Sequence, residues 1–170
     1  VNVINSIRKI NCIDDVIREQ YLASESSIKK FKSYKENKGV EKNSKTETFF
    51  ACKLFIDNDR WKDVPFFIRT GKRLPTKVTE IVVNFKKNNN IFSSQNQNNT
   101  LIFRLQPDEG MLVKFNLKKP GHKSEIISKN LEFHYKKLGK NVINNAYETL
   151  ILDVFKGDTM LFSRSDFVEK

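Results

Sequence analysis

The amino-acid sequence predicts an α+β fold in the order helix, several antiparallel strands and helix. Residues 101–106 and 111–118 alternate apolar and polar side chains and flank the turn residues 107–110, which predicts a β-hairpin. Residues 81–85 are short and β-branched and predict another strand. Apolar residues that repeat every four positions over 142–154 predict an amphipathic helix.

The start of the chain is expected to be helical. Ile4, Ile7 and Ile10 are spaced in threes, as on one face of a helix. An acidic pair at positions 14–15 precedes the apolar pair 16–17, as acidic residues do at a helix start. The sequence therefore predicts helical structure in this first segment.

The middle of the chain combines loops with strand candidates. Residues 22–45 are polar with little periodicity and predict a solvated loop. Residues 49–56 are almost continuously apolar, which fits either a strand covered on most of both faces or a turn-bounded apolar helix. In segment 64–69 any strand should begin at or after Pro65. Residues 86–100 are rich in Lys, Asn, Ser and Gln and predict a loop.

The later elements have recognisable ends. Pro120 and Gly121 should end the second strand of the hairpin, and residues 126–135 predict a further strand. Gly157 is a suitable C-terminal stop for the amphipathic helix. The length of 170 residues is that of one domain, so we expect residues 1–170 to form a single domain.

The chain is basic, but its charge is dispersed. The formal net charge is +11 and the pI is about 9.6, and 24 lysines outnumber 7 arginines. A stand-alone basic module that binds nucleic acid through phosphate contacts is therefore an alternative reading. Because the lysines are scattered along the whole chain, we favour a domain without a nucleic-acid partner.

Catalytic, metal and membrane signals are not found in the sequence. His122 and His134 have no acidic residue at a spacing that suggests a proton relay, and the six glycines stand alone, which excludes a Rossmann phosphate loop from this segment. Cys12 and Cys52 provide neither a disulfide framework nor a zinc site, and Cys52 is expected to be a buried free thiol. No apolar run is long enough for a membrane span, and no signal peptide is visible.

A cluster of cations follows the strand candidate at 64–69. In the segment 69–73, two arginines and Lys72 surround Gly71. Lys72 and Lys77 flank Pro75, so both ammonium groups could converge on one small anion. The alternative is a solvated basic loop, and the residue pattern alone leaves both readings open.

Several motifs resemble those of glucose-6-phosphate dehydrogenases. The longest is RWKDVPFFIRTGKRLPTKVTEIVVNF at 60–85. Others are SKTETF at 44–49, LQPDEG at 105–110, KPG at 119–121 and AYETLILDVFKGDTMLFSR at 146–164. The resemblance covers residues 4–168 in order and spacing, and identifies the chain with the C-terminal domain of this family.

The resemblance implies a role on the substrate side of an enzyme. Members of the family oxidise glucose 6-phosphate to 6-phosphogluconolactone with NADP, in the first step of the oxidative pentose phosphate pathway. Lys72 and Lys77 match lysines at the glucose 6-phosphate site, Gln106 matches a glutamine that approaches the sugar, and Arg104 lies two residues earlier on the same strand face.

The family's catalytic histidine and NADP loop belong to an N-terminal Rossmann domain that this sequence does not contain. The chain is therefore expected to carry no catalytic residue and to be inactive by itself, and NADP is expected to be bound mainly by the other domain. The resemblance further implies a large, mostly antiparallel β-sheet with helices packed on one face, and a cytoplasmic homodimer formed through that sheet. A second, structural NADP site of animal-type members is not expected, because Val82 occupies one of its arginine positions.

Overall fold

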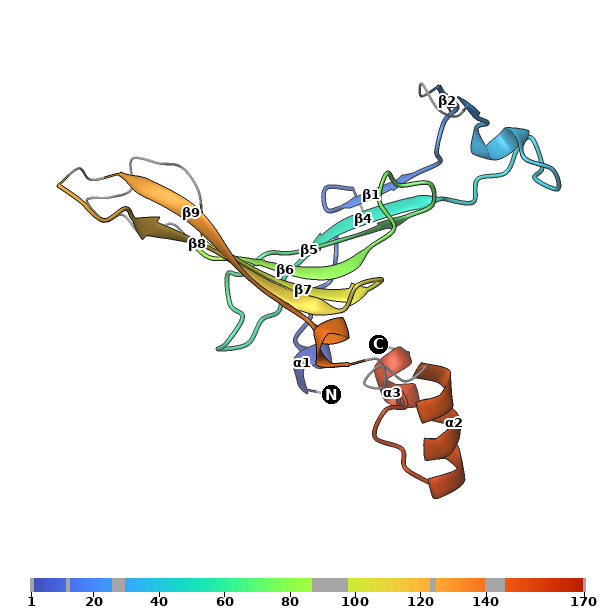
Figure 1. Ribbon diagram of the computed structural model, residues 1–170. Helices are drawn as coiled ribbons and strands as arrows, with labels where there is room; N and C mark the ends of the chain where they lie inside the picture. Colours follow the sequence, from blue (N-terminus) through green and yellow to red (C-terminus); the bar gives the residue numbers. More distant parts are fainter. Residues whose placement is uncertain are drawn as a thin grey trace. The chain divides into compact units, whose positions relative to one another are not determined.

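The computed structural model describes residues 2–11, 13–25, 30–86, 98–122, 125–139 and 146–169. The chain divides into two compact units, of which the first comprises Val1–Pro75 with Phe162–Lys170 and the second comprises Thr76–Leu161 (Figure 1). Each unit contains its own antiparallel sheet.

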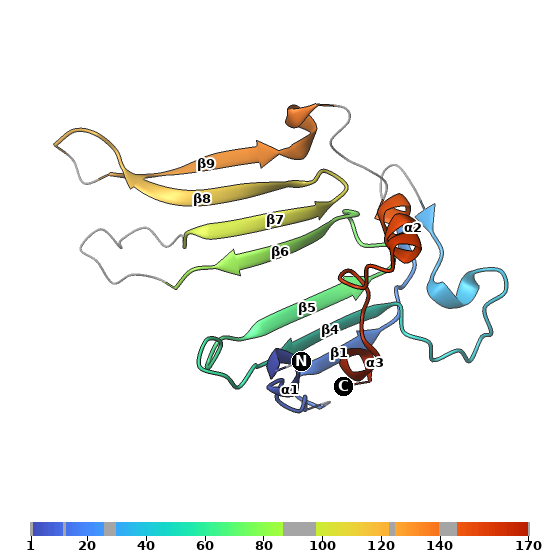
Figure 2. The same cartoon turned by 90° about the horizontal axis from the view of Figure 1, so that it is seen from below.

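The first unit is built on a three-stranded antiparallel sheet (Figure 2). Its strand order is β1-β4-β5, with bounds Val16–Glu19 for β1, Phe49–Leu54 for β4 and Phe66–Gly71 for β5. The near-continuous apolar segment is therefore a strand, and its central position explains why its apolar side chains do not simply alternate with polar ones. Cys52 in β4 and Ile56 just after it are the buried apolar residues of the described chain, with 7% and 8% of their surface exposed.

The N-terminal segment differs from the expected helix. Helix α1 covers only Asn2–Asn5, and Ile7 instead forms an isolated bridge with Ile56. The prediction of a helix start at positions 16–17 is wrong, because these residues form β1 and pair with Cys52 and Ala51 of β4. β-Branched side chains fit such a pleated surface, and the pairing with a distant strand outweighs the local acidic signal.

The described parts of the polar segment 22–45, residues 22–25 and 30–45, contain regular structure that was not expected of a solvated loop. They contain the paired strands β2 (Ser24–Glu25) and β3 (Lys30–Phe31) and the 3-10 helix η1 (Tyr34–Glu36). The rings of Tyr21 and Tyr34 meet edge to face at 5.9 Å, and the Asn37 side chain donates a hydrogen bond to Tyr21 Oη at 3.1 Å. The contact between these two tyrosines therefore helps to organise a segment whose composition is mainly polar.

The second unit is built on a four-stranded antiparallel sheet of order β6-β7-β8-β9. The strands are β6 (Thr79–Asn84), β7 (Thr100–Gln106), β8 (Gly110–Lys118) and β9 (Ile126–His134). The predicted hairpin is confirmed as β7 and β8, and β8 ends directly before the KPG motif. The predicted strands at 81–85 and 126–135 are confirmed as β6 and β9. Most of the predicted loop at 86–100 lies outside the described residues.

One face of this sheet carries a continuous row of exposed apolar side chains. Ile81, Phe103, Met111 and Phe133 lie opposite one another on the four successive strands. Their exposed fractions are 54%, 37%, 40% and 40%. Aromatic and β-branched cross-strand neighbours stabilise a sheet, but here they leave an apolar surface uncovered within the described residues.

The C-terminal helix is confirmed for its described part. Helix α2 spans Ala146–Lys156, and Gly157 follows with a φ of +68°, the left-handed conformation that suits a helix end. The 3-10 helix η2 (Tyr135–Leu138) directly follows β9, whereas positions 142–145 of the predicted helix lie outside the described residues. The short helix α3 is Ser165–Val168.

The α+β class with antiparallel sheets is confirmed, with two differences in detail. The strands form separate three-stranded and four-stranded sheets, besides the β2–β3 pair, instead of one large sheet. Helix α2 leaves the side chains of Ile151, Val154 and Phe155 57%, 65% and 84% exposed. None of the helices in the described ranges has the length and hydropathy needed to span a bilayer.

Candidate functional site

The predicted phosphate-binding lysine, Lys72, lies directly after β5. Gly71 ends that strand, and a Cβ at this position would come within 3.0 Å of Phe49 Cδ2 and 3.2 Å of the Thr48 carbonyl oxygen. The Lys72 backbone N–H donates to the same carbonyl oxygen at 2.8 Å. The backbone is therefore held close to the start of β4, while the Lys72 side chain is exposed.

The residue after Lys72 is held in an unusual conformation. Arg73 has a φ of +58°, which is uncommon for a residue with a side chain. Its guanidinium carbon lies 5.4 Å from the ring centre of Tyr21 and 5.2 Å from that of Phe31, both within cation–π range. The cationic segment 69–73 is thus attached to the aromatic residues of segment 21–34.

In the second unit, Lys77 lies just before strand β6 and Gln106 lies at the end of the neighbouring strand β7. Gln106 is the last residue of β7 and lies opposite Thr79, the first residue of β6. Lys77 precedes that residue by two positions, and both Lys77 and Gln106 are exposed. The structure therefore places these two predicted site residues near the same end of the sheet.

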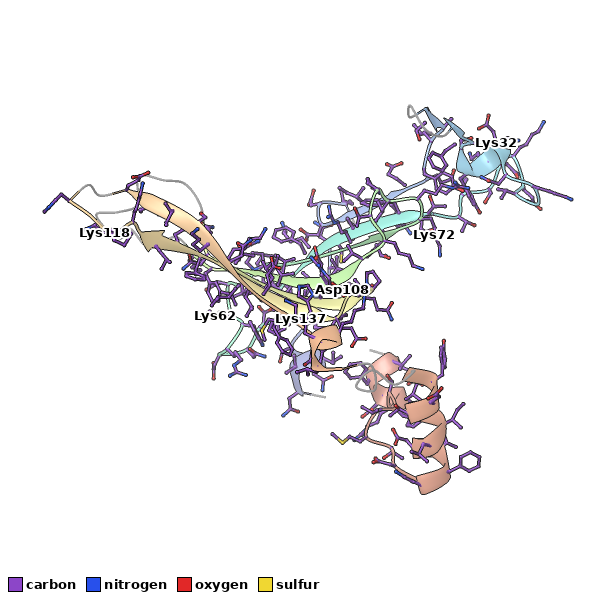
Figure 3. The ribbon with its side chains drawn as sticks, in the orientation of Figure 1. Lys32, Lys62, Lys72, Asp108, Lys118 and Lys137 are labelled. Atoms are coloured by element: carbon purple, nitrogen blue, oxygen red, sulfur yellow. The ribbon has the colours of Figure 1, made fainter. Side chains whose placement is uncertain are left out.

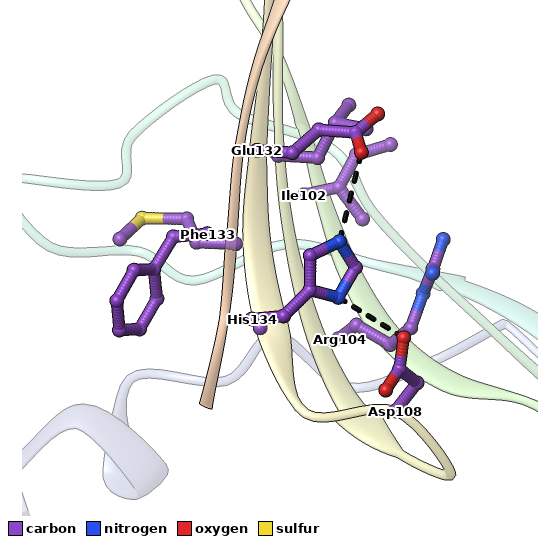
Figure 4. Close-up of a pocket in the computed structure, with 9 residues that line it drawn as sticks. Ile102, Arg104, Asp108, Glu132, Phe133 and His134 are labelled. Carbon is purple, nitrogen blue, oxygen red and sulfur yellow. Dashed lines mark ion pairs between the residues drawn. The ribbon is translucent and has the colours of Figure 1, made fainter. Parts of the chain in front are cut away.

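Arg104 lines a small pocket that also includes Gly110, Met111 and Phe133 (Figure 4). The pocket has a volume of about 70 Å³ and combines Ile102 and Leu112 with the charged groups of Arg104, Asp108, Glu132 and His134. The Arg104 Nε atom is buried and has no hydrogen-bond partner among the described residues. Arg104 thus shares a pocket with acidic residues of its own unit.

His134, for which the sequence spacing indicated no acidic partner for a proton relay, lies close to two acidic side chains. His134 Nδ1 lies 3.0 Å from Asp108 Oδ2, and Nε2 lies 3.6 Å from Glu132 Oε2 (Figure 4). A neutral imidazole carries only one N–H donor, so both contacts are attractive together only when the ring is protonated. The antiparallel register of β8 and β9, which places Gly110 opposite His134, brings the histidine to the turn that carries Asp108.

Asp108 links this turn to the end of β9. Lys136 Nζ lies 2.9 Å from Asp108 Oδ1, and the Tyr135 N–H donates to the Glu109 carbonyl oxygen at 3.0 Å. The hydrogen bond from Lys136 lowers the pKa of the Asp108 carboxyl below its ordinary value, and the charges of Lys136 and His134 act in the same direction. The turn that follows Gln106 is therefore fixed by backbone and charged contacts.

The predicted site residues are divided between the units. Lys72 belongs to the first unit, whereas Lys77, Arg104 and Gln106 belong to the second. The structure brings the Lys77 segment and Gln106 to one end of the sheet of the second unit, whereas Arg104 lines the pocket described above. Within the first unit, Lys32, Lys62 and Lys72 project from different loops (Figure 3), so they do not form one basic face.

No group of three or more His, Cys, Asp or Glu side chains that could hold a metal ion occurs in the described ranges. Cys52 is buried as expected for a free thiol, and Cys12 lies outside the described residues. Sequence reasoning missed the Arg73 contacts and the Asp108–His134 pair, because each joins residues that are distant in the chain.

Comparison with known families identifies the chain. The family model described as "Glucose-6-phosphate dehydrogenase, C-terminal domain" matches residues 1–170. The chain belongs to this family. The RTGKRL motif, which contains Lys72, indicated this family from the sequence, and the match over the whole chain agrees with it.

Individual relatives give the same assignment. The chain is 46% identical over 155 residues to the glucose-6-phosphate 1-dehydrogenase of Aggregatibacter actinomycetemcomitans, covering 91% of this chain and 31% of that protein. It is 44% identical over 178 residues to the enzyme of Borreliella burgdorferi, covering 99% of this chain and 37% of that protein. The chain thus spans about a third of the length of these relatives.

A solved structure has the same fold. A glucose-6-phosphate dehydrogenase in complex with its substrate glucose-6-phosphate matches with a TM-score of 0.85 at 34% identity, over 97% of this chain and 34% of that protein. The glucose-6-phosphate 1-dehydrogenase from Mycobacterium avium matches with a TM-score of 0.77 at 30% identity, over 98% of this chain and 34% of that protein. Both matches extend over nearly the whole of this chain.

Proposed function

We propose that residues 1–170 are the substrate-side domain of an NADP-dependent glucose-6-phosphate dehydrogenase. The reaction transfers a hydride from C1 of glucose 6-phosphate to NADP and releases a proton, giving 6-phosphogluconolactone and NADPH. The observation that carries the proposal is the family match over the whole chain together with its RTGKRL motif. This sequence has no dinucleotide loop, so the proposal assigns NADP and the catalytic base to an N-terminal nucleotide-binding domain.

The proposed substrate contacts are Lys72, Lys77 and Gln106. The two lysines offer exposed ammonium groups and are separated by only four residues in the chain, so they are suited to the phosphate dianion. Gln106 offers an amide that can both donate to and accept from sugar hydroxyls. Arg104 is a weaker candidate, because Asp108, Glu132 and His134 share its pocket.

Activity measurements test whether the substrate contacts belong to this domain and the catalytic base and NADP to the other. The purified 170-residue chain, given glucose 6-phosphate and NADP, should form no NADPH, as followed by its absorbance. The same domain joined to its nucleotide-binding domain should form NADPH. NADPH formation by the isolated chain would refute the assignment of the base to the other domain, and an inactive joined protein would refute the proposed reaction.

We further propose that the protein is a homodimer formed through the sheet of the second unit. The exposed row of Ile81, Phe103, Met111 and Phe133 supports this, since an uncovered apolar surface favours association. Phe103→Lys should convert the dimer to a monomer in light scattering coupled to gel filtration. Leu22→Lys, at a residue that is 80% exposed in the first unit, is the matched control and should leave the dimer intact. A dimeric Phe103→Lys protein would contradict the proposal.

The remaining assignments follow from the same reaction. We propose a cytoplasmic location, which the buried free thiol of Cys52 supports. Despite the net charge of +11, nucleic acid is not among the proposed partners. The protein should therefore show no salt-sensitive binding to a generic DNA duplex at physiological ionic strength.

A further inference from the structure

We propose that Arg73 is a positioning residue that orients Lys72 for phosphate binding, and that Tyr21 and Phe31 hold it in place. The inference rests on the proposed function of Lys72. Its starting point is the pair of cation–π contacts, in which the Arg73 guanidinium lies 5.4 Å from one ring centre and 5.2 Å from the other. Two aromatic faces on one guanidinium restrict it more than a single contact would.

The rings that hold Arg73 are themselves fixed. Tyr21 and Phe31 are half-buried, and the Tyr21 ring meets Tyr34 edge to face at 5.9 Å. The Tyr21 hydroxyl accepts a hydrogen bond from Asn37 at 3.1 Å. The aromatic residues therefore form a supported surface for Arg73, which we call the aromatic clamp (Tyr21 and Phe31).

A second connection joins the clamp to the Lys72 backbone. The Tyr21 N–H donates to Thr48 Oγ1 at 2.9 Å, and the Thr48 carbonyl oxygen accepts from the Lys72 N–H at 2.8 Å. Tyr21 is thus connected to Lys72 by way of Thr48, and it contacts Arg73 directly through its ring. The closed set of contacts restricts the backbone on both sides of the Lys72 Cα atom.

The backbone conformation explains why such a restraint is useful. Arg73 has a φ of +58°, which a residue with a side chain adopts rarely unless its surroundings impose it. Without the clamp, the segment after Gly71 would relax to more common conformations, and Lys72 would point in several directions. Binding phosphate would then require this freedom to be lost again, which weakens affinity without altering the chemical step.

The test is made in the complete enzyme, in which this domain is joined to its nucleotide-binding domain. Tyr21→Leu and Phe31→Leu remove one ring each and leave every charge in place. Each should raise the KM for glucose 6-phosphate by about fivefold to twentyfold and raise the inhibition constant of inorganic phosphate in parallel. The kcat and the KM for NADP should change less than twofold.

Matched controls separate the clamp from general loss of structure. Phe67→Leu removes an aromatic ring from β5 that is 75% exposed, and it should leave the KM for glucose 6-phosphate unchanged. Tyr21→Phe loses the hydrogen bond from Asn37 but keeps the ring, its edge-to-face contact with Tyr34 and the backbone hydrogen bond to Thr48, so it should also retain the normal KM. If Tyr21→Leu does not fold, Phe31→Leu carries the test.

A double-mutant comparison distinguishes this inference from the proposed function. In a Lys72→Ala background, Tyr21→Leu should produce no further rise in the KM, because the clamp acts through Lys72. If Lys72→Ala itself leaves the KM unchanged, the proposed substrate site fails. If Lys72→Ala raises the KM but both ring variants behave like Phe67→Leu, the substrate site stands and the positioning role is overturned. The role is equally overturned if Arg73→Gln raises the KM while the ring variants do not, because Arg73 then acts only through its charge.

Discussion

The close approach of β8 and β9 at Gly110 predicts a specific cost for one added methyl group. A Cβ atom at this buried position would overlap the carbonyl oxygen of Phe133 and lie 3.3 Å from His134 Cα. Both obstacles are backbone atoms, so no side-chain rotation can relieve them. Gly110→Ala should therefore push β9 away from β8 and lower the free energy of unfolding by about 1–3 kcal/mol.

The region that Gly110→Ala destabilises tests the reasoning as directly as the size of the stability loss does. Urea unfolding should show the loss of stability, and hydrogen exchange should show faster exchange of the β9 amides. Gly39→Ala is the comparison variant: a Cβ there meets no atom within 4 Å, and its cost arises from a φ of +84° alone. It should leave β9 exchange unchanged. Normal β9 exchange in Gly110→Ala, with a stability within about 0.5 kcal/mol of the parent protein, would refute the reasoning.

Two further substitutions test the charged turn and the buried thiol. Asp108 has a pKa lowered in the folded state, so its carboxylate stabilises the fold above the ordinary aspartate pKa of about 3.9 and this contribution is lost as the pH falls through the lower folded-state value. Asp108→Asn should consequently lower the melting temperature at pH 7 but make little difference at a pH below the folded-state pKa, and an equal deficit at every pH would contradict the sign. Cys52→Ser should reduce the free energy of unfolding by about 1–3 kcal/mol, because Cys52 is only 7% exposed and a hydroxyl there loses its water. An unchanged urea midpoint would argue against burial of this position.

Local turn chemistry made much of the fold predictable. The sequence of Pro107 to Gly110 between two alternating segments identified the β7–β8 hairpin, and Pro65 correctly bounded the start of β5. The Gly157 signal likewise marked the end of α2. In these cases the residues that determine the element lie within it or beside it.

Elements that depend on distant partners were not predictable in this way. Val16 and Ile17 form a strand because β4 is available to pair with them, whereas their acidic neighbours suggested a helix. Segment 22–45 has a polar composition, but Tyr34 and Phe31 give it structure through contacts with Tyr21 and Arg73. Propensity within a short window does not contain this information.

The candidate site shows the same difference between features that local residues indicate and features that depend on distant partners. Lys72, Lys77 and Gln106 were chosen from motifs and remain predictions, since their roles depend on a substrate and a second domain. The Asp108–His134 contact was missed because 26 positions separate the two residues, and only the register of β8 and β9 brings them together. The alternation of apolar and polar residues indicated the strands, but alternation alone does not determine which residues of β8 and β9 lie opposite one another.

The most direct test of the account is the effect of Lys72→Ala on the two substrates of the complete enzyme. Loss of one charge-assisted hydrogen bond of about 1.5–3 kcal/mol should raise the KM for glucose 6-phosphate roughly tenfold to a hundredfold. The KM for NADP should remain within about twofold of the parent value, because the nucleotide is assigned to the other domain. Equal increases in both constants, or no increase for glucose 6-phosphate, would contradict the claim that this domain supplies part of the sugar-phosphate site.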